Sequence, residues 1–397
     1  MKVKLDNAYL SGEIKAIPSK SYAHRIAICN FLAGKNPTAE CGDFSSNDIA
    51  VTEKCLKDLM DGKKDLDCGE SGSTLRFMIP LCASLGGNYS LFGHGKLMQR
   101  PNDQLFSVIS ENGVNVEQTD KIYLSGKLLA GKYAIRGDVS SQYVSGLLMA
   151  LPTLNGDSEI VLTTPLVSAP YVEITLEVLR SFGVIIEKTK DGYFIKGNQK
   201  YSGRVMPEGD WSNQAFFLCA GAINGNVTVT GLNENSVQGD KYILDILSLA
   251  GANVEVTKGT VKVKKSSLKP FTFDAQDCPD LVPISAVLAC YADGKSVIKN
   301  IQRLKIKESD RVESTIAMLS AFGVKATCDG ENLTVYGGKI KGGEVDSFND
   351  HRIVMSTAVL ALGANGSSFI NGAQAVNKSY PTFFIDYNGI GGKASEV

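Results

Sequence analysis

The sequence of 397 residues contains only three histidines and has no excess of charge of either sign. His24, His94 and His351 are far apart, so none is paired at the i,i+4 spacing of helical zinc ligands. We therefore expect no metal site. Lys plus Arg number 41 and Asp plus Glu 42, which gives a formal net charge of −1. A protein that binds duplex nucleic acid normally has a basic surplus, so nucleic acid is not expected as a partner.

The nine cysteines are odd in number and form no CxxC motif. We expect reduced, mostly buried thiols in a cytoplasmic protein. The first residues, MKVKLDNAYL, lack the apolar core of a signal peptide, and no apolar run approaches the roughly 20 residues of a membrane span. The sequence thus predicts a soluble, cytoplasmic protein with no membrane partner.

The common nucleotide and acyl-transfer motifs are also missing. There is no GxxxxGK[ST] loop, no GxGxxG after a predicted strand, and no GxSxG. Nucleotide hydrolysis, dinucleotide redox chemistry and serine-based acyl transfer therefore have no support. No cofactor is predicted.

Two patterns recur along the chain. The first is an apolar helix end, a glycine, an alternating strand and a second alternating strand. Its glycines are 68–72 residues apart: Gly113, Gly183, Gly251 and Gly323. The second is a polar cluster, an apolar helix, a glycine turn and a strand. It occurs six times, with turn glycines Gly34, Gly87, Gly156, Gly225, Gly294 and Gly366.

These patterns predict an α/β fold of six units, the first of them shortened. A single core stops growing near roughly 250–300 residues, so two domains of three units are favoured. An open solenoid is the structural alternative. The helices expected over 140–150 and 211–222 are apolar nearly all round. They should therefore lie inside their domains, with the strands outside.

The six helices begin with unusually polar and basic residues. The starts are Ser19-Lys20-Ser21 with Arg25, Ser71-Gly72-Ser73-Thr74 with Arg76, Ser140-Ser141-Gln142, Asp210-Trp211-Ser212, Asp280, and Asn349-Asp350-His351-Arg352. Helix N-termini bind phosphate and carboxylate well, whereas cations there oppose the dipole by ~0.3–1 kcal/mol each. An anionic ligand would reverse that effect. The alternative is that Ser and Asp are ordinary N-caps and each Arg packs its stem along a surface.

Three further basic segments have the same character: MQRP with Arg100, RLKIKESDR and NKSYP with Lys378. A solvated charged loop is the alternative for RLKIKESDR. The pattern as a whole predicts a cleft between two domains that binds multiply anionic small molecules. Asp280 and Glu308 would offer proton-transfer groups beside its cations.

Eleven segments, in order from Ile17 to Phe384, resemble the 5-enolpyruvylshikimate-3-phosphate (EPSP) synthase family. They are IPSKSYAHRIAI, GESGSTLRF, MQRP, DVSSQYVSGLLMALP, LVSAPYVEITL, EGDWSNQAFFL, NSVQGD, QDCPDLVP, IKESDRVES, FNDHRIVMS and NKSYPTFF. The resemblance implies a 3-phosphoshikimate 1-carboxyvinyltransferase of the shikimate pathway of aromatic amino-acid biosynthesis. Such an enzyme moves the enolpyruvyl group of phosphoenolpyruvate to the 5-hydroxyl of shikimate 3-phosphate and releases phosphate.

The resemblance also implies a fold and an assembly. The fold is a two-domain inside-out α/β barrel, each domain with three βαβαββ units, and the active site lies in the interdomain cleft. The first domain, 18–208, is inserted and mainly binds shikimate 3-phosphate. The second, 1–17 plus 209–397, carries Asp280, Glu308, Arg311, Arg352 and Lys378. A monomer without cofactor is implied.

The resemblance assigns roles to individual residues. Asp280 is the candidate base for the 5-hydroxyl, and Glu308 exchanges protons with the methylene carbon of phosphoenolpyruvate, with Lys20 as a competing general acid. Phosphoenolpyruvate would be held by Lys20, Gly72, Arg100, Gln142, Arg311, Arg352 and Lys378. Shikimate 3-phosphate would be held by Ser21, Arg25, Ser140, Ser141, Gln142, Ser168, Tyr171, Asp280 and Lys307.

Some positions depart from the family pattern. Glu70 and Ser73 replace the usual Asn and Thr beside the phosphoenolpyruvate site, which leaves sensitivity to phosphonates such as glyphosate open. Arg303 and Ala169 stand where some members have Asn and Lys. The sister family that acts on UDP-N-acetylglucosamine usually has a reactive Cys where this chain has Gly95, which disfavours that alternative. A non-catalytic anion-binding scaffold is the second alternative.

Overall fold

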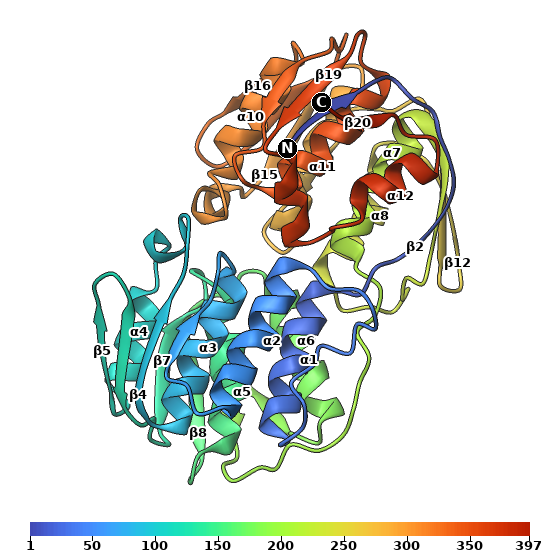
Figure 1. Cartoon of the computed structure of the whole chain (residues 1–397). Coiled ribbons are helices and arrows are strands. Elements are labelled where there is room, and N and C mark those ends of the chain that lie inside the picture. Colours follow the sequence, from blue (N-terminus) through green and yellow to red (C-terminus); the bar gives the residue numbers. More distant parts are fainter. The chain divides into compact units, whose positions relative to one another are not determined.

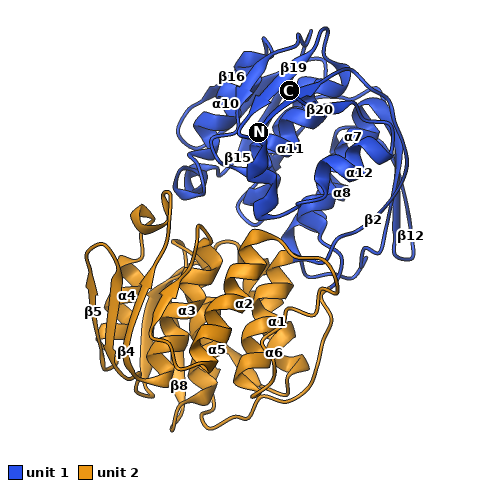
Figure 2. Cartoon of the chain, viewed as in Figure 1, with its two compact units in different colours: residues 1–19, 208–397 blue, residues 20–207 orange.

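The computed structural model describes residues 1–397, which form two compact units. Unit 1 comprises residues 1–19 and 208–397, and unit 2 comprises residues 20–207 (Figures 1 and 2). The chain thus leaves unit 1 once and returns once. Backbone hydrogen bonds tie the two connections together, since the Ser19 N–H donates to the Glu208 carbonyl at 2.8 Å. No helix has the length and apolar character needed to cross a lipid bilayer.

Unit 2 contains a layer of helices and two four-stranded sheets (Figure 1). Its α-helices are α1 (Lys20–Leu32), α2 (Asn47–Met60), α3 (Gly72–Leu85), α4 (Asp103–Ser110), α5 (Ser141–Ala150) and α6 (Ala169–Ser181). One sheet has the order β3 (Asp65–Asp67), β4 (Gly87–Phe92), β6 (Ile122–Gly126), β5 (Val114–Gln118). The other has the order β7 (Lys132–Arg136), β8 (Ser158–Thr164), β10 (Gly192–Ile195), β9 (Ile186–Thr189).

Unit 1 contains three four-stranded sheets. Its α-helices are α7 (Trp211–Asn224), α8 (Ile243–Leu249), α9 (Val282–Cys290), α10 (Arg311–Ala321), α11 (His351–Leu360) and α12 (Phe383–Gly389). The first sheet is β2 (Leu10–Lys15), β11 (Gly225–Thr230), β13 (Thr260–Lys264), β12 (Asn253–Thr257). The second is β14 (Thr272–Asp274), β15 (Lys295–Lys299), β17 (Leu333–Tyr336), β16 (Lys325–Cys328). The third is β18 (Glu344–Asp346), β19 (Ser368–Asn371), β1 (Lys2–Leu5), β20 (Ala394–Glu396).

All five sheets share one topology. In each, a parallel pair is extended by an antiparallel pair, as in β14 with β15 followed by β17 with β16. Helices connect the first strand to the second and the second to the third, so the repeat reads βαβαββ. In the third sheet of unit 1 the N-terminal β1 occupies the place of the last strand. The predicted repeat is therefore confirmed for five of the six units.

The first repeat differs from the prediction. A strand was expected after the Gly34 turn, but residues 33–46 contain none. Pro37 lies in this segment and cannot donate to a strand ladder. The Ala39 N–H instead donates to the Glu53 carboxylate of α2 at 2.7 Å. A side chain thus satisfies the backbone where the other repeats use a neighbouring strand.

The most apolar helices are inside each unit, as predicted. In unit 1, α7, α9 and α11 pack against one another, and nearly every residue of each is buried. In unit 2, α5 packs against both α3 and α6. The strands alternate between buried and partly exposed residues, which β11 illustrates. One face of each sheet therefore covers the helices, and the other faces outward.

The recurring glycines end the helices as expected. Gly183 follows α6 with a φ of 76°, and its N–H donates to the Arg180 carbonyl. The next N–H, of Val184, reaches back to the Leu179 carbonyl. This is the glycine-terminated helix end that a left-handed residue allows. It turns the chain directly into the following strand.

Candidate functional site

The acidic and hydroxyl residues at several helix starts are N-caps. A side-chain oxygen accepts a hydrogen bond from a backbone N–H of the first turn at Ser71, Ser140, Asp210, Asp310 and Asp350. The capping interpretation is therefore correct for these residues. Capping does not explain the Lys and Arg side chains nearby. They belong to two polar clusters, one around Arg311 in unit 1 and one at the starts of α1, α2, α3, α5 and α6 in unit 2.

The cluster in unit 1 centres on Arg311, the first residue of α10, whose side chain is 1% exposed. Its Nη1 lies 2.7 Å from Asp280 Oδ1, and its Nη2 lies 2.6 Å from Glu308 Oε2. Its Nε lies 2.7 Å from Asp350 Oδ2. Burial alone would lower the pKa of Arg311, but the carboxylates, Asp350 foremost, raise it well above its ordinary value.

Asp280 faces two further cations. It lies in the short 3-10 helix η4 (Pro279–Leu281), which leads into α9. Arg352 Nη2, at the start of α11, donates to Asp280 Oδ2 at 2.9 Å and to the Ser212 hydroxyl at 2.7 Å. Lys307 Nζ lies 3.5 Å from Asp280 Oδ1. Burial lowers the pKa of Lys307 to about 8, although the charge of Asp280 opposes the effect.

Two more residues of unit 1, Lys378 and Asp240, lie beside the residues of this cluster. Lys378 ends η7 (Ala373–Lys378), and its Nζ donates to the Asn349 carbonyl just before α11 at 2.8 Å. Asp240, in η3 (Gly239–Tyr242), is buried. Burial, followed by the charge of Asp280, raises the pKa of Asp240 to about 6. The structure thus brings the predicted Asp280, Lys307, Glu308, Arg311 and Arg352 together.

In unit 2, Arg25 connects α1 with α6. Its Nε donates to the Thr175 hydroxyl at 2.6 Å and its Nη2 to the Tyr171 carbonyl at 2.9 Å. Its Nη1 donates to the Ser21 carbonyl at 2.6 Å. Burial lowers the pKa of Arg25 to about 10. Three predicted residues, Ser21, Arg25 and Tyr171, are therefore neighbours. Ser168 directly precedes α6 and has a left-handed conformation with a φ of 53°.

Lys20 has an acidic partner that the sequence did not suggest. Its Nζ lies 2.8 Å from Asp48 Oδ2, in the first turn of α2. Both side chains are largely buried, at 17% and 14% exposed. A pair of this kind holds Lys20 in one place more firmly than a surface pair would.

The start of α3 contributes a further group of polar residues to the cluster of unit 2. A Cβ atom on Gly72 would lie 2.2 Å from Arg100 Nη1, so the Arg100 guanidinium lies directly over this glycine. Arg76 Nη1 donates to Gln142 Oε1 at 2.7 Å, and Gln142 Nε2 donates to the Ser73 hydroxyl at 2.8 Å. These contacts connect the starts of α3 and α5, where Ser140 and Ser141 also lie.

The residues that sequence reasoning missed are mainly partners of the cations. Asp48, Asp240 and Asp350 all contribute carboxylates to the two clusters. Asp350 stood among the helix starts in the sequence, but nothing there paired it with Arg311. The available signal was that each basic helix start needs a compensating charge when it is buried.

The cysteines and histidines do not form a metal centre. All nine cysteines are free, and seven are buried, which confirms the prediction of mostly buried thiols. His24 is also buried, and its Nδ1 lies 2.7 Å from the Thr52 hydroxyl. No group of three or more His, Cys, Asp or Glu side chains could hold a metal ion.

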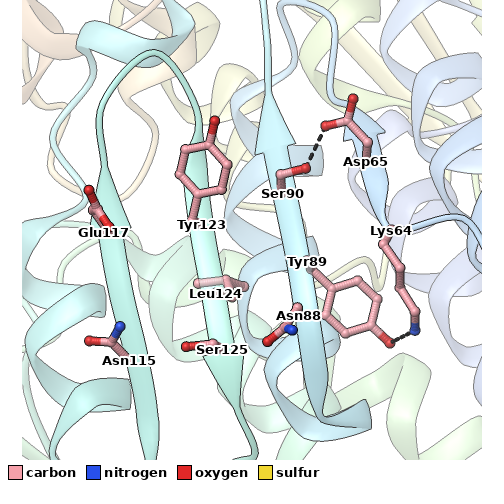
Figure 3. A pocket seen from close by; sticks show the side chains of 10 residues that line it. All are labelled: Lys64, Asp65, Asn88, Tyr89, Ser90, Asn115, Glu117, Tyr123, Leu124 and Ser125. Atoms are coloured by element: carbon pink, nitrogen blue, oxygen red, sulfur yellow. Dashed lines mark hydrogen bonds between the residues drawn. The ribbon is translucent and has the colours of Figure 1, made fainter.

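A surface hollow of about 400 Å³ lies on the sheet of β3, β4, β5 and β6 in unit 2. Figure 3 shows Tyr123 and Ser90 side by side on adjacent strands, and Lys64 reaching the Tyr89 hydroxyl. None of the predicted site residues lines this hollow. It is therefore separate from the two polar clusters.

Comparisons with known proteins converge on one family. The family model described as EPSP synthase (3-phosphoshikimate 1-carboxyvinyltransferase) matches residues 47–386. A Clostridium acetobutylicum protein named 3-phosphoshikimate 1-carboxyvinyltransferase is 39% identical over 99% of this chain and 98% of its own length. A Methanococcus maripaludis protein of the same name is 35% identical over 96% of both chains.

Solved structures show the same fold. EPSP synthase from Acinetobacter baumannii aligns with a TM-score of 0.79 at 22% identity, covering 100% of both chains. The enolpyruvyl transferase NikO from Streptomyces tendae aligns with a TM-score of 0.80 at 17% identity, covering 100% of this chain and 98% of its own. These likenesses confirm the predicted two-domain inside-out α/β architecture.

Proposed function

The chain belongs to the EPSP synthase family, and we propose that it transfers the enolpyruvyl group of phosphoenolpyruvate to the 5-hydroxyl group of shikimate 3-phosphate, releasing phosphate. The observation that carries this proposal is the cluster around Arg311. Two candidate proton-transfer carboxylates, Asp280 and Glu308, share one guanidinium at 2.7 and 2.6 Å. Acid–base chemistry on an anionic substrate needs this combination of groups.

We place phosphoenolpyruvate on cations from both units. Its carboxylate and phosphate would contact Lys20, Gly72, Arg100 and Gln142 of unit 2, and Arg311, Arg352 and Lys378 of unit 1. Arg311 and Arg352 suit these groups because a guanidinium binds carboxylate and phosphate in a bidentate manner. Turnover would then require residues of both units.

We place shikimate 3-phosphate mainly on the helix starts of unit 2. Ser140 and Ser141 at the start of α5 would receive the 3-phosphate, since N–H groups at a helix N-terminus bind phosphate. Ser21, Arg25, Gln142, Ser168 and Tyr171 would complete this set, and Lys307 and Asp280 would meet the acceptor from unit 1. The short contacts of Arg25 to the Ser21 and Tyr171 carbonyls support grouping these residues.

The proposed mechanism is addition followed by elimination. Protonation of the methylene carbon makes the adjacent carbon electrophilic, and the 5-oxygen of the acceptor adds to it as its proton passes to Asp280. The tetrahedral intermediate then loses a proton from the new methyl group and expels phosphate. Glu308 would exchange the proton at carbon, with Lys20 as the competing acid. The protein supplies positions and charges and forms no covalent bond to substrate.

Phosphate release tests this function. We expect the purified protein to release phosphate from phosphoenolpyruvate only when shikimate 3-phosphate is present. Asp280→Ala and Glu308→Gln should each lower kcat roughly 10²–10⁴-fold while changing the two KM values far less. Turnover of both variants at the wild-type rate would show that these carboxylates do not transfer protons.

The same assay separates the alternatives. The matching family is the one that uses shikimate 3-phosphate, and Gly95 occupies the position where the sister family usually has a reactive Cys. Turnover with UDP-N-acetylglucosamine in place of shikimate 3-phosphate would move the chain to that sister activity. No turnover with either acceptor would favour a non-catalytic scaffold. We also place the protein in the cytoplasm as a monomer, because nine free thiols suit a reducing compartment.

A further inference from the structure

Arg311 has more carboxylate partners than one guanidinium needs. Asp280 accepts from Nη1 at 2.7 Å and Glu308 from Nη2 at 2.6 Å. Asp350 accepts from Nε at 2.7 Å and, through its other oxygen, from Nη2 at 3.3 Å. The three differ in burial, because the side chains of Asp280 and Glu308 are 16% and 22% exposed whereas that of Asp350 is 0% exposed. Only the first two could be replaced by a ligand arriving from solvent.

Asp350 is built into the protein from several directions. Its Oδ2 accepts from Arg311 Nε and from the Ser309 hydroxyl at 3.1 Å. Its Oδ1 caps α11 by accepting from the Arg352 backbone N–H at 2.9 Å. The same carboxylate thus fixes the Arg311 side chain and the backbone of the helix turn that carries Arg352. Because its side chain is 0% exposed, a substrate arriving from solvent would not reach it.

We propose that Asp350 is a positioning residue that holds the Nε edge of Arg311, while Asp280 and Glu308 hold its outer nitrogens only until the phosphoenolpyruvate carboxylate replaces them. This inference rests on the proposed function. A guanidinium has two edges that each present a pair of N–H donors. The edge of Nε and Nη2 stays with Asp350, and the edge of Nη1 and Nη2 exchanges partners. Binding of phosphoenolpyruvate thereby frees Asp280 and Glu308 from Arg311, so that both carboxylates can transfer protons.

Asp350→Asn tests the positioning role. Asn keeps the size of the side chain and is an equally good N-cap through its one oxygen. The substitution removes the negative charge and puts an amide donor in place of the oxygen that accepts from Arg311 Nε and Ser309. We expect the KM for phosphoenolpyruvate to rise tenfold or more, while the KM for shikimate 3-phosphate stays within twofold. Asp310→Asn is the matched control, because Asp310 caps α10 through the Val312 and Glu313 N–H groups. It should leave both KM values within twofold.

Equal changes of the KM for phosphoenolpyruvate in Asp350→Asn and Asp310→Asn would overturn the inference, since they would trace the effect to helix capping. An unchanged KM in Asp350→Asn would overturn it as well. Should Asp350→Asn fail to fold, Ser309→Ala removes only one donor to the same carboxylate and should raise this KM by about threefold. No change in Ser309→Ala would then refute the positioning role. If the wild-type protein itself releases no phosphate, the proposed function fails instead.

The exchange of partners has its own signature in pH profiles. Asp280 faces Arg311 from α10, Arg352 from α11, Lys307 from the segment before α10, and Asp240 from η3. In the free protein, the Arg311 guanidinium donates to Asp280 and thereby favours the ionised carboxylate. Once phosphoenolpyruvate has replaced Asp280 on Arg311, the Asp280 carboxylate is easier to protonate. The acid limb of kcat should therefore lie at higher pH than the acid limb of kcat/KM for phosphoenolpyruvate. Coincident limbs would show that Asp280 keeps its contact with Arg311.

Discussion

Substituting Gly72 with Ala should reduce catalysis while leaving the fold as stable or more so. Gly72 begins α3, and an added Cβ would lie 2.2 Å from Nη1, 2.8 Å from Cζ and 3.1 Å from Nη2 of Arg100. Every one of these atoms belongs to the far end of a flexible side chain. The Arg100 guanidinium will therefore move, and the helix will stay in place.

The two effects have different sizes. Replacing Gly by Ala at a position whose backbone suits both stabilises a protein by about 0.4–1 kcal/mol, which for a unit of this size raises Tm by about 1–4 °C. Moving Arg100 would remove the charged hydrogen bond that we propose it makes to phosphoenolpyruvate, worth about 1.5–3 kcal/mol. That loss lowers kcat/KM for phosphoenolpyruvate by roughly 10- to 150-fold.

Thermal unfolding and phosphate release on the same preparation measure both effects. Gly389→Ala is the control, because Gly389 ends α12 and a Cβ there would meet no heavy atom within 4 Å. It should change Tm in the same direction and leave kcat/KM unaltered. A Gly72→Ala protein with wild-type kcat/KM would refute the proposed role of Arg100, and a large fall in Tm would show that the helix, not the side chain, gives way.

Two further predictions concern pH. Burial lowers the pKa of Lys307 from 10.5 to about 8, so Lys307 loses its charge above that pH. The KM for shikimate 3-phosphate should therefore rise above pH 8 in the wild type. It should not rise there in Lys307→Gln. Because the unfolded chain binds more protons between these values, the same group makes the free energy of unfolding rise over that range. Burial, then the charge of Asp280, raises the pKa of Asp240 from 3.8 to about 6, so its contribution to the free energy of unfolding falls between these pH values. Asp240→Asn should therefore exceed the wild-type Tm by more at pH 7.5 than at pH 5, and an equal difference at both would contradict the raised pKa.

The repeats could be predicted because they depend on local patterns. A helix that ends at a left-handed glycine and turns into an alternating strand is encoded within about ten residues, and Gly183 and Gly323 adopt that conformation, with φ of 76° at each. The strand expected after Gly34 was wrong for one local and one non-local reason. The local reason is Pro37, which cannot donate to a strand ladder. The non-local reason is that the Ala39 N–H donates to Glu53 of α2, and no periodic pattern reveals such a partner.

The site was predictable as a set of cations but not as a set of pairs. Lys20, Arg25 and Arg352 stood out because cations at a helix start oppose the dipole, and Arg311 stood out as part of a basic segment. Their partners come from distant parts of the chain, since Asp350 is 39 residues from Arg311 and Asp280 is 72 residues from Arg352. Pairing of this kind depends on how the helices pack, which a periodicity cannot specify.

The carboxylates that pair with the Lys and Arg side chains offer a second explanation for the basic helix starts. From the sequence, an anionic ligand was one explanation for the basic helix starts, but in this structure carboxylates already pair with several of these cations. Asp48 accompanies Lys20, and the three carboxylates around Arg311 balance the charges of Arg311, Arg352 and Lys307. Under the proposed function, a phosphoenolpyruvate anion that binds Arg311 would therefore have to displace a carboxylate. That exchange would couple binding to the release of Asp280 and Glu308, the two carboxylates proposed to transfer protons.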